Sequence, residues 1–186
     1  MVEFSLLAPI LLTLVIGSYE TANYVLADLK LQAAAETAAD LVAQTPVIDS
    51  SGNANYLRSA DFTNITNAAD QVMSPFATGS GQLKIAYASI VYDSSQNKVS
   101  LDWSVVVNGA TAINPASLPN GAVASNLIST TSGSTDSVIV VQLTYTYTSP
   151  ISYVLNSSYT ITETAFNRPR YMNCIPTYLN TGNTCP

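Results

Sequence analysis

The chain has 186 residues, with 12 Asp and Glu against 6 Lys and Arg, no His, and a formal net charge of −6. Six basic residues cannot form a phosphate-binding stripe, which argues against nucleic acid as a partner. Charged residues make up only 10% of the chain. The remaining polarity comes from Ser, Thr, Asn and Gln, a composition common in extracellular surface proteins.

The first seventeen residues are almost wholly apolar, with one carboxylate at Glu3. A secretory signal peptide needs a basic region before its apolar core, and no Lys or Arg precedes Lys30. The run from Phe4 to Ile16 is shorter than the roughly 20 residues that span a bilayer. The residues that follow can extend it if Glu20 faces a partner or the membrane interface. The sequence therefore predicts a membrane-inserted helix.

This apolar start continues without a break into an alanine-rich segment, so one long helix is predicted from near Glu3 to about Ala43. Thr45-Pro46 should end it, because proline lacks a backbone donor and disfavours helical backbone in the residue before it. Beyond the apolar start, apolar residues recur at steps of three and four, which predicts an amphipathic helix. They are Tyr19, Ala22, Leu26, Leu29 and Ala33, with Ala34, Ala38, Leu41 and Val42 extending the stripe.

Pro9 and Gly17 interrupt this helix. Pro9 removes the hydrogen bond to the carbonyl of Ser5 and should bend the axis. Gly17 and Ser18 form the weakest point for helix propensity in the segment. Both sites are candidate hinges, but proline and glycine are also simply tolerated in membrane helices, and the residues leave the two readings open.

The rest of the chain predicts a β-rich domain. About 140 residues suffice for one hydrophobic core. Ser59 or Asp61 can cap a short helix that runs to about Met73 and ends at Ser74-Pro75. Residues 114–127 favour a short helix plus a loop. The Ser/Thr/Gly-rich segment 125–137 is expected to be mobile.

Four strands are expected, and the first two flank a turn at residues 93–97 as an antiparallel hairpin. The alternating pattern puts Leu101, Trp103 and Val105 on one face of the second strand. The predicted strands are 83–92, 98–107, 137–148 and 159–166. The expected fold is therefore α+β, with a membrane or filament-core helix over residues 1–45 and an extracellular domain with a roughly four-stranded antiparallel sheet and short helices over residues 46–186.

The two cysteines, Cys174 and Cys185, stand in the last thirteen residues around a proline and a glycine. They predict a disulfide that closes a terminal loop, stabilising by about 2–3 kcal/mol in the chain-entropy model and implying an oxidising compartment. Free thiols or half a metal site are the alternative, which the lack of histidine and of a CxxC pair disfavours.

Catalytic motifs are missing from the sequence, and neither an enzyme nor a cofactor or metal is expected. The acids are scattered, and no nucleophile elbow, P-loop or GxGxxG occurs. Asp93 and the polar residues after it could coordinate calcium, but a hairpin turn uses the same residue types. Asn64 and Asn156 fit the glycosylation acceptor pattern, although such triplets also arise by chance in a chain rich in Ser, Thr and Asn.

The start of the chain resembles a known family. The segment Val2–Pro9, the run Leu11–Gly17, Tyr24 and the segment Leu31–Ala39 are similar to the N-terminal region of TadE-like and TadG-like pilins of the tight-adherence branch of type IV pili. The resemblance implies processing by a prepilin peptidase and insertion in the inner membrane with the ectodomain outside. It also implies assembly, by pilus machinery, into a fimbrium that serves cell adhesion.

Five residues are candidates for assembly: Met1, Glu3, Phe4, Pro9 and Gly17. A carboxylate among apolar helices costs several kcal/mol unless it is paired, and the cation available at that depth is a terminal α-amino group. We expect Glu3 to accept the Met1 amine of the adjacent subunit and so to fix the axial register. Alternatively, Glu3 only complements the positive end of its own helix dipole.

Two functions remain open from the sequence. In the first, the chain is the structural subunit of a homo-oligomeric helical filament, with its helices in the core and its β domains outside. In the second, it is a minor pseudopilin or a tip-located adhesive module, whose segments 125–137 and 174–185 contact a surface or another pilin.

Overall fold

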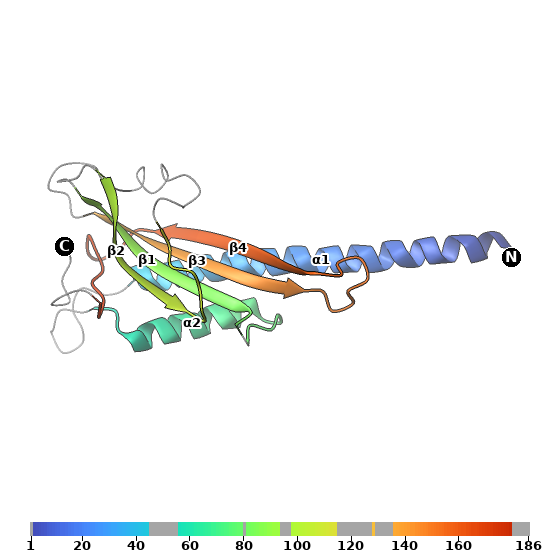
Figure 1. Ribbon diagram of the computed structural model, residues 1–186, viewed down its shortest axis with the longest axis horizontal. Helices are drawn as coiled ribbons and strands as arrows, with labels where there is room; N and C mark the ends of the chain where they lie inside the picture. The colour runs from blue at the N-terminus through green and yellow to red at the C-terminus, as the bar shows by residue number, and fades with distance from the viewer. Residues whose placement is uncertain are drawn as a thin grey trace.

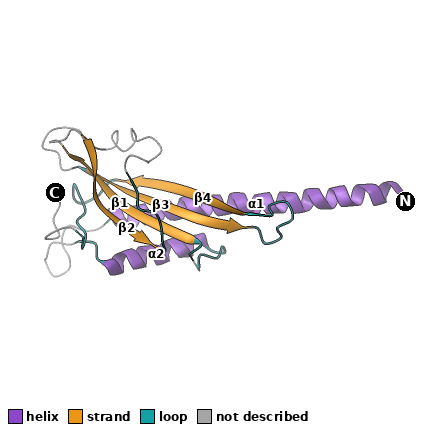
Figure 2. Cartoon of the chain, viewed as in Figure 1, coloured by secondary structure: helices purple, strands orange, loops and turns teal. Residues whose placement is uncertain are grey.

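The computed structural model describes residues 2–44, 56–79, 81–93, 98–114, 128 and 136–179. The elements in these residues are α1 (Val2–Ala43), α2 (Ser59–Met73), β1 (Leu83–Asp93), β2 (Lys98–Val107), β3 (Ser137–Thr148) and β4 (Ser158–Asn167). The fold is α+β, as predicted: a long N-terminal helix is followed by a short helix and a four-stranded antiparallel sheet (Figures 1 and 2).

Helix α1 confirms the predicted single long helix and is continuous through Pro9 and Gly17. Its last turn closes with a hydrogen bond of 3.0 Å from the Gln44 amide to the Asp40 carbonyl. The C-terminal half of α1 lies against the sheet, whereas its N-terminal end projects beyond every other element (Figure 1).

The sheet has the strand order β2-β1-β3-β4, and all neighbours are antiparallel. The predicted hairpin is therefore confirmed as β1 and β2. The predicted strands 137–148 and 159–166 are confirmed as β3 and β4, with β4 one residue longer at each end. Residues 137–141 of β3 are buried on both faces, as expected for a central strand covered on both sides.

One face prediction is wrong in β2. Trp103 pairs with Ser89, but Leu101 pairs with Ile90, so Asp102 is an extra residue in the ladder. Such a bulge moves the following side chains to the other face. Trp103 and Val105 are buried, whereas Leu101 is 42% exposed. The alternating pattern could not reveal an inserted residue.

The sheet carries a core on each face. The larger core lies between the sheet and the two helices, and it includes Leu31, Phe62, Tyr87 and Leu143. The smaller core lies on the opposite face, where Ile113 and Ile128 from the β2–β3 connection pack on Ile90 and Val138, among others. The helices therefore cover one face only, and α1 contacts β3, β4 and α2.

Helix α2 ends as predicted, at Met73, but its N-cap is Arg58 and not Ser59 or Asp61. Asp61 still helps the helix start, because its Oδ2 accepts the Arg58 amide at 2.8 Å, the reach-back half of a capping box. On its buried face, the hydroxyl groups of Thr66 and Tyr87 share a hydrogen bond of 3.1 Å. This contact fixes α2 on β1.

The C-terminal segment is held at the end of the sheet away from the helix N-terminus. Residues 174–177 are buried, the Trp103 Nε1 donates to the Ile175 carbonyl at 2.8 Å, and Leu57 pairs with Thr177 in an isolated parallel bridge. Arg170 is tied to the end of α1 by its amide, which donates to the Ala43 carbonyl at 3.0 Å, and by its ion pair with Asp40.

Several predictions lie outside the described residues. They concern the helix stop at Thr45-Pro46, the turn at residues 94–97, the short helix plus loop in 115–127, and most of the mobile segment 125–137.

Candidate functional site

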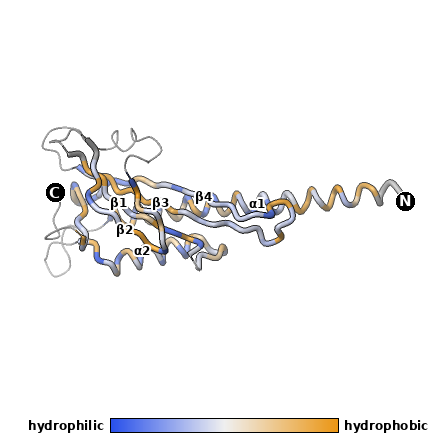
Figure 3. The backbone as a smooth tube through the Cα atoms, viewed as in Figure 1, coloured by the Kyte–Doolittle hydropathy of each residue, from blue (hydrophilic) through white to orange (hydrophobic). Residues whose placement is uncertain are grey.

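The projecting part of α1 is an apolar arm, which we define as residues 6–19. Seven of its large aliphatic side chains are 56% to 68% exposed. They are Leu6, Leu7, Ile10, Leu11, Leu12, Leu14 and Val15. Figure 3 shows the arm as a continuous hydrophobic stretch. Soluble monomers rarely expose a contiguous apolar surface of this extent, and such surfaces mark membrane or protein contacts.

Three hydroxyl groups on and beside the arm have hydrogen-bond partners within α1 itself. Thr13, Ser18 and Thr21 each donate to the carbonyl four residues earlier, at 2.8, 2.7 and 2.8 Å. In lipid every polar group must find an internal partner, and back-bonding of this kind supplies one. By length and composition α1 is able to cross a membrane.

Beyond the arm, α1 is apolar on two opposite faces. The face on the sheet is formed by Ala27, Leu31, Ala34, Ala38 and Val42, all fully buried. The first part of the predicted stripe points the other way: Tyr19, Ala22, Leu26, Leu29 and Ala33 are exposed. The prediction of one apolar stripe is therefore wrong, because the predicted residues lie on two different faces. The face on the sheet is rich in alanine, and these small side chains let α1 pack closely on the sheet.

Glu20 is the first charged residue after Glu3, and it is fully buried. The covering segment is the β3–β4 loop, residues 149–157. The Glu20 Oε1 accepts the Ser149 hydroxyl at 2.9 Å and the Tyr153 amide at 2.8 Å. The Oε2 accepts the amides of Val154 at 2.7 Å and Leu155 at 2.8 Å. All four partners are donors, which matches an ionised carboxylate.

The local conformation of the loop explains this convergence. Ser152 adopts a left-handed backbone with a φ of 55°, and its hydroxyl donates to the Ser149 carbonyl at 2.7 Å. The turn aims the next three amides at one point, and successive amides of this kind form an anion-binding nest. Here the anion is a side chain of the same chain, which ties the loop to α1.

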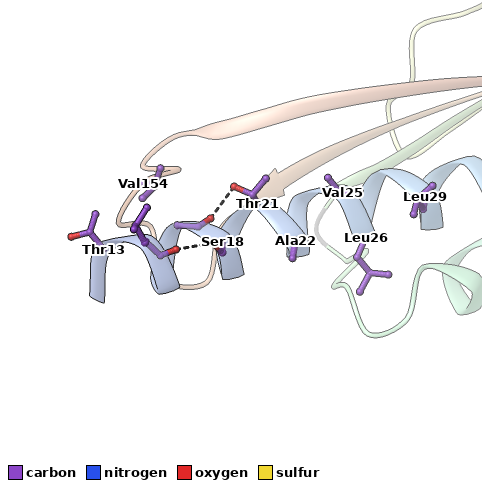
Figure 4. Close-up of a pocket in the computed structure, with 10 residues that line it drawn as sticks. Thr13, Ser18, Thr21, Ala22, Val25, Leu26, Leu29 and Val154 are labelled. Carbon is purple, nitrogen blue, oxygen red and sulfur yellow. Dashed lines mark hydrogen bonds between the residues drawn. The ribbon is translucent and has the colours of Figure 1, made fainter. Parts of the chain in front are cut away.

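A groove runs along the exposed face of α1 where the loop meets it. It has a volume of about 900 Å³, and Val154 forms its wall. Figure 4 shows the lining side chains of Thr21, Val25 and Leu29 along one side of the helix. The other lining residues are Thr13, Leu14, Gly17, Ser18, Ala22 and Leu26. The groove is long, open and apolar, which suits another helix better than a small polar ligand.

The residues predicted for assembly fall at the projecting end of the molecule. Glu3 and Phe4 lie in the first turn of α1, and Pro9 lies in the arm. Gly17 borders the groove, where a methyl group added to it would be 3.5 Å from Val154, an ordinary contact. Met1 lies outside the described residues, so the predicted pairing of Glu3 with a Met1 amine stays a prediction.

The remaining predicted sites are spread over the ectodomain. Cys174 is buried and Cys185 lies outside the described residues, so the disulfide stays a prediction. Asn64 on α2 and Asn156 in the β3–β4 loop are exposed, and their glycosylation also stays a prediction. In the part of the chain that the structure describes, no cluster of three or more metal-binding side chains occurs.

Sequence reasoning did not find the partner of Glu20. The signal for an unusual role was present, because Glu20 interrupts an otherwise uncharged run from Phe4 to Ala27. Its partners lie 129 to 135 positions later in the chain. Every residue except proline has a backbone amide, so the sequence does not show which amides bind Glu20. These donors could be identified only from the folded structure.

Comparison with known families agrees with the resemblance seen at the N-terminus. The family model described as TadE-like protein matches residues 1–40. This match covers α1 up to Asp40, including the arm, Glu20 and the groove. The TadE-like family is structural and pilus-associated. No curated protein and no solved structure matches the chain.

Proposed function

We propose that this chain is a structural pilin subunit of a Tad-type pilus. Before assembly, α1 anchors the subunit in the inner membrane. The subunit then assembles through the same helix into an extracellular filament. The observation that carries the proposal is the two-faced helix: one face of α1 packs on its own sheet, while the opposite face and the whole arm remain apolar and exposed.

One subunit alone in water cannot bury the apolar side chains of the arm. Each large aliphatic side chain gains about 1.5–3 kcal/mol when it leaves water. Seven of those in the arm are 56% to 68% exposed in the described chain, where Val154 meets only the end of the arm near Gly17. Lipid covers these side chains before assembly, and the helices of neighbouring subunits cover them afterwards. The family match at residues 1–40 supports this role, because it falls on the segment that carries the exposed surface.

The groove is the site for the α1 helix of a second copy. Its lining alternates small residues, such as Ser18 and Ala22, with larger ones, such as Val25 and Leu29. Small residues at a spacing of four let two helix backbones approach closely in a lipid environment. The helix that docks there carries the same apolar arm, so the contact is one between identical chains.

The rest of the chain fits an external domain. Residues 1–45 form the membrane and filament-core helix, and residues 46–186 form the domain that tiles the outside. Prepilin peptidase and the pilus assembly machinery are its expected partners before extrusion, and a Cys174–Cys185 disulfide is expected in the oxidising compartment. Glu3 and the neighbouring Met1 amine set the axial register.

Abundance in sheared filaments tests the proposal against a minor or tip-located role. A structural subunit provides most of the filament mass, and its loss abolishes filaments. A minor pseudopilin or adhesive module is scarce in the same preparation. Recovery of this chain as a trace component of filaments built from another pilin would contradict the structural role and favour the minor one.

A further inference from the structure

We propose that the β3–β4 loop is a lipid-contacting collar that holds the ectodomain on the membrane surface before assembly. In this arrangement Ile151, Tyr153 and Val154, together with Tyr19, lie in the headgroup region of the bilayer. The inference rests on the proposed insertion of the arm and adds a second membrane contact, made by a segment far from α1 in sequence.

The first argument is position. The uncharged run from Phe4 to Tyr19 has sixteen residues, or about 24 Å of helix, slightly less than a hydrocarbon core of about 30 Å. The loop is bound at Glu20, the residue that ends this run. The loop therefore sits at the depth where a helix inserted up to Tyr19 leaves the hydrocarbon.

The second argument is the exposed surface of the loop. Ile151, Tyr153 and Val154 are 48%, 61% and 49% exposed, although Leu155 beside them packs on the core. The loop sequence, SPISYVLNS, contains no charged residue. Tyr19 on α1 is 52% exposed next to it. Tyrosines with one apolar and one polar end are typical of the membrane–water interface.

The third argument concerns how the charge of Glu20 is tolerated there. A carboxylate close to lipid is costly, but the loop surrounds this one with three amides and a hydroxyl. The contact satisfies Glu20 and fixes the loop at the same time. Exposed polar residues such as Asn156 and Ser157 keep the loop in the headgroup region, because irregular backbone does not face hydrocarbon.

A lipid surface is the occupant favoured over a second copy of the chain. The groove that suits a second helix lies along α1 with Val154 as its wall, whereas Ile151 and Tyr153 do not line it. Both belong to the loop that binds Glu20, at the end of the uncharged run that inserts in the proposed arrangement. This position at the membrane boundary assigns them to lipid.

Tryptophan reporters in the full chain, reconstituted at low density in phosphatidylcholine vesicles, test the collar. Tyr153→Trp reports the loop and Leu12→Trp reports the arm. Tyr171→Trp is the matched control, because Tyr171 is also 61% exposed but follows Arg170, which is bonded to the far end of α1. The native Trp103 is 3% exposed and gives a constant background.

Quenching is measured with lipids brominated near the headgroup end or near the middle of the acyl chain. We expect a roughly twofold loss of the Tyr153→Trp emission with shallow bromines and a smaller loss with deep ones, as for an interfacial side chain. Leu12→Trp should be quenched more by deep bromines, and Tyr171→Trp by neither.

The outcomes separate the collar from the proposed function. If Leu12→Trp is quenched but Tyr153→Trp behaves like Tyr171→Trp, the collar is wrong and insertion of the arm stands. If Tyr153→Trp is not quenched by lipid at low protein density and its emission changes only at high protein density, its partner is a second copy and the lipid assignment is wrong. If Leu12→Trp is not quenched, the membrane arm itself fails, and the collar fails with it.

Discussion

At the residue scale, the defining feature is a buried carboxylate that meets donors only. Four hydrogen bonds from the β3–β4 loop converge on Glu20. A side chain in this position must be an acceptor at both oxygens, because each one receives two donors. The four loop donors and the two negatively charged oxygens of Glu20 together explain how a charged residue is accommodated between an apolar arm and an apolar helix face.

Glu20→Gln should therefore loosen the loop. In the variant, an NH2 group replaces one of the two carboxylate oxygens of Glu20. Because this group is a donor, the loop donors that bonded to that oxygen lose their acceptor. We expect the amides of residues 153–155 to exchange with solvent on the order of tenfold faster, as measured by hydrogen exchange. Glu36→Gln, at an exposed site on the same helix, is the matched control, and equal exchange in both variants would contradict the role of Glu20.

Glu3→Gln addresses the other carboxylate in the first half of α1 and the register proposed above. The variant keeps the size of the side chain but removes its charge, so a neighbouring α-amino group would be left buried without a counter-charge, at a cost of several kcal/mol. Filaments should be lost while membrane insertion persists. Filament yields equal to the unmodified protein would reduce Glu3 to a residue that only complements the helix dipole.

Tyr87 predicts an alkaline limit to stability. Burial raises the pKa of Tyr87 to about 12, although the hydrogen bond with Thr66 partly opposes this, and Asp70 adds to the rise. The folded state therefore favours the neutral phenol. The neutral phenol contributes its full share to the free energy of unfolding below pH 10. This share is lost as the pH rises from about 10 to about 12, and the loss is about 1 kcal/mol at the midpoint of that window.

Denaturant unfolding at neutral pH and near pH 11 measures this loss. The Tyr87→Phe variant should show a smaller decrease in unfolding free energy between the two conditions than the unmodified chain. It should not abolish the decrease, because burial also raises the pKa of Tyr145 and Tyr147. A decrease of the same size in the variant would show that Tyr87 does not titrate in this way.

At the element scale, one face of α1 serves folding, and the opposite face is free for the proposed contact with a second copy. The sheet-facing side is rich in alanine and is fully buried, while the groove side carries Val25 and Leu29, which are 48% and 57% exposed. Removing a side chain from the groove face therefore costs the fold little. In the proposed filament, the same change removes a contact with a neighbouring subunit.

Leu29→Glu tests this division. The new charge lies between Asp28 and Lys30, past the arm, so folding and insertion should be unaffected. In the groove, however, it would be buried against an apolar helix without a partner, which costs several kcal/mol, and filament yield should fall sharply. Thr63→Glu, at an exposed site on α2, adds the same charge and should assemble normally; a similar loss in both variants would contradict the groove contact.

The elements were largely predictable from local patterns. Long apolar or alternating runs gave α1 and all four strands, because periodicity reports element type directly. The bulge at Asp102 was not predictable, since an inserted residue leaves the composition of β2 unchanged and acts only through the pairing register. The face of α1 that packs on the sheet was predicted only in part, through Ala34, Ala38 and Val42. A helix that is apolar on two faces does not show by its periodicity which face packs on the sheet.

At the scale of the whole molecule, the described chain is a β-rich domain with a projecting helix. The larger core is built from the C-terminal half of α1, α2 and the sheet, and none of its members precedes Tyr24. The arm adds no contact to this core. The folding core and the proposed membrane attachment therefore reside in separate parts of the same helix.

Deletion of residues 1–18 should give a soluble, monomeric, β-rich domain. The variant keeps Glu20 and the complete core, so its circular dichroism should retain the strand signal. Light scattering should report one subunit in solution without detergent. Oligomers of the same size as those of the full chain would show that the ectodomain itself carries the assembly contacts.

The self-bonded hydroxyls of Thr13, Ser18 and Thr21 have a further, energetic consequence for assembly and disassembly. A helix that moves from lipid to a neighbouring helix exchanges one apolar environment for another, so hydrophobicity does not drive that transfer, and no hydroxyl has to change its partner. Return to water is different, because re-exposing the seven large aliphatic side chains of the arm costs about 10–20 kcal/mol. In the proposed filament, growth from the bilayer therefore meets almost no apolar barrier, whereas loss of a subunit into the surrounding medium is strongly opposed, so that a fibre detached from the membrane stays assembled.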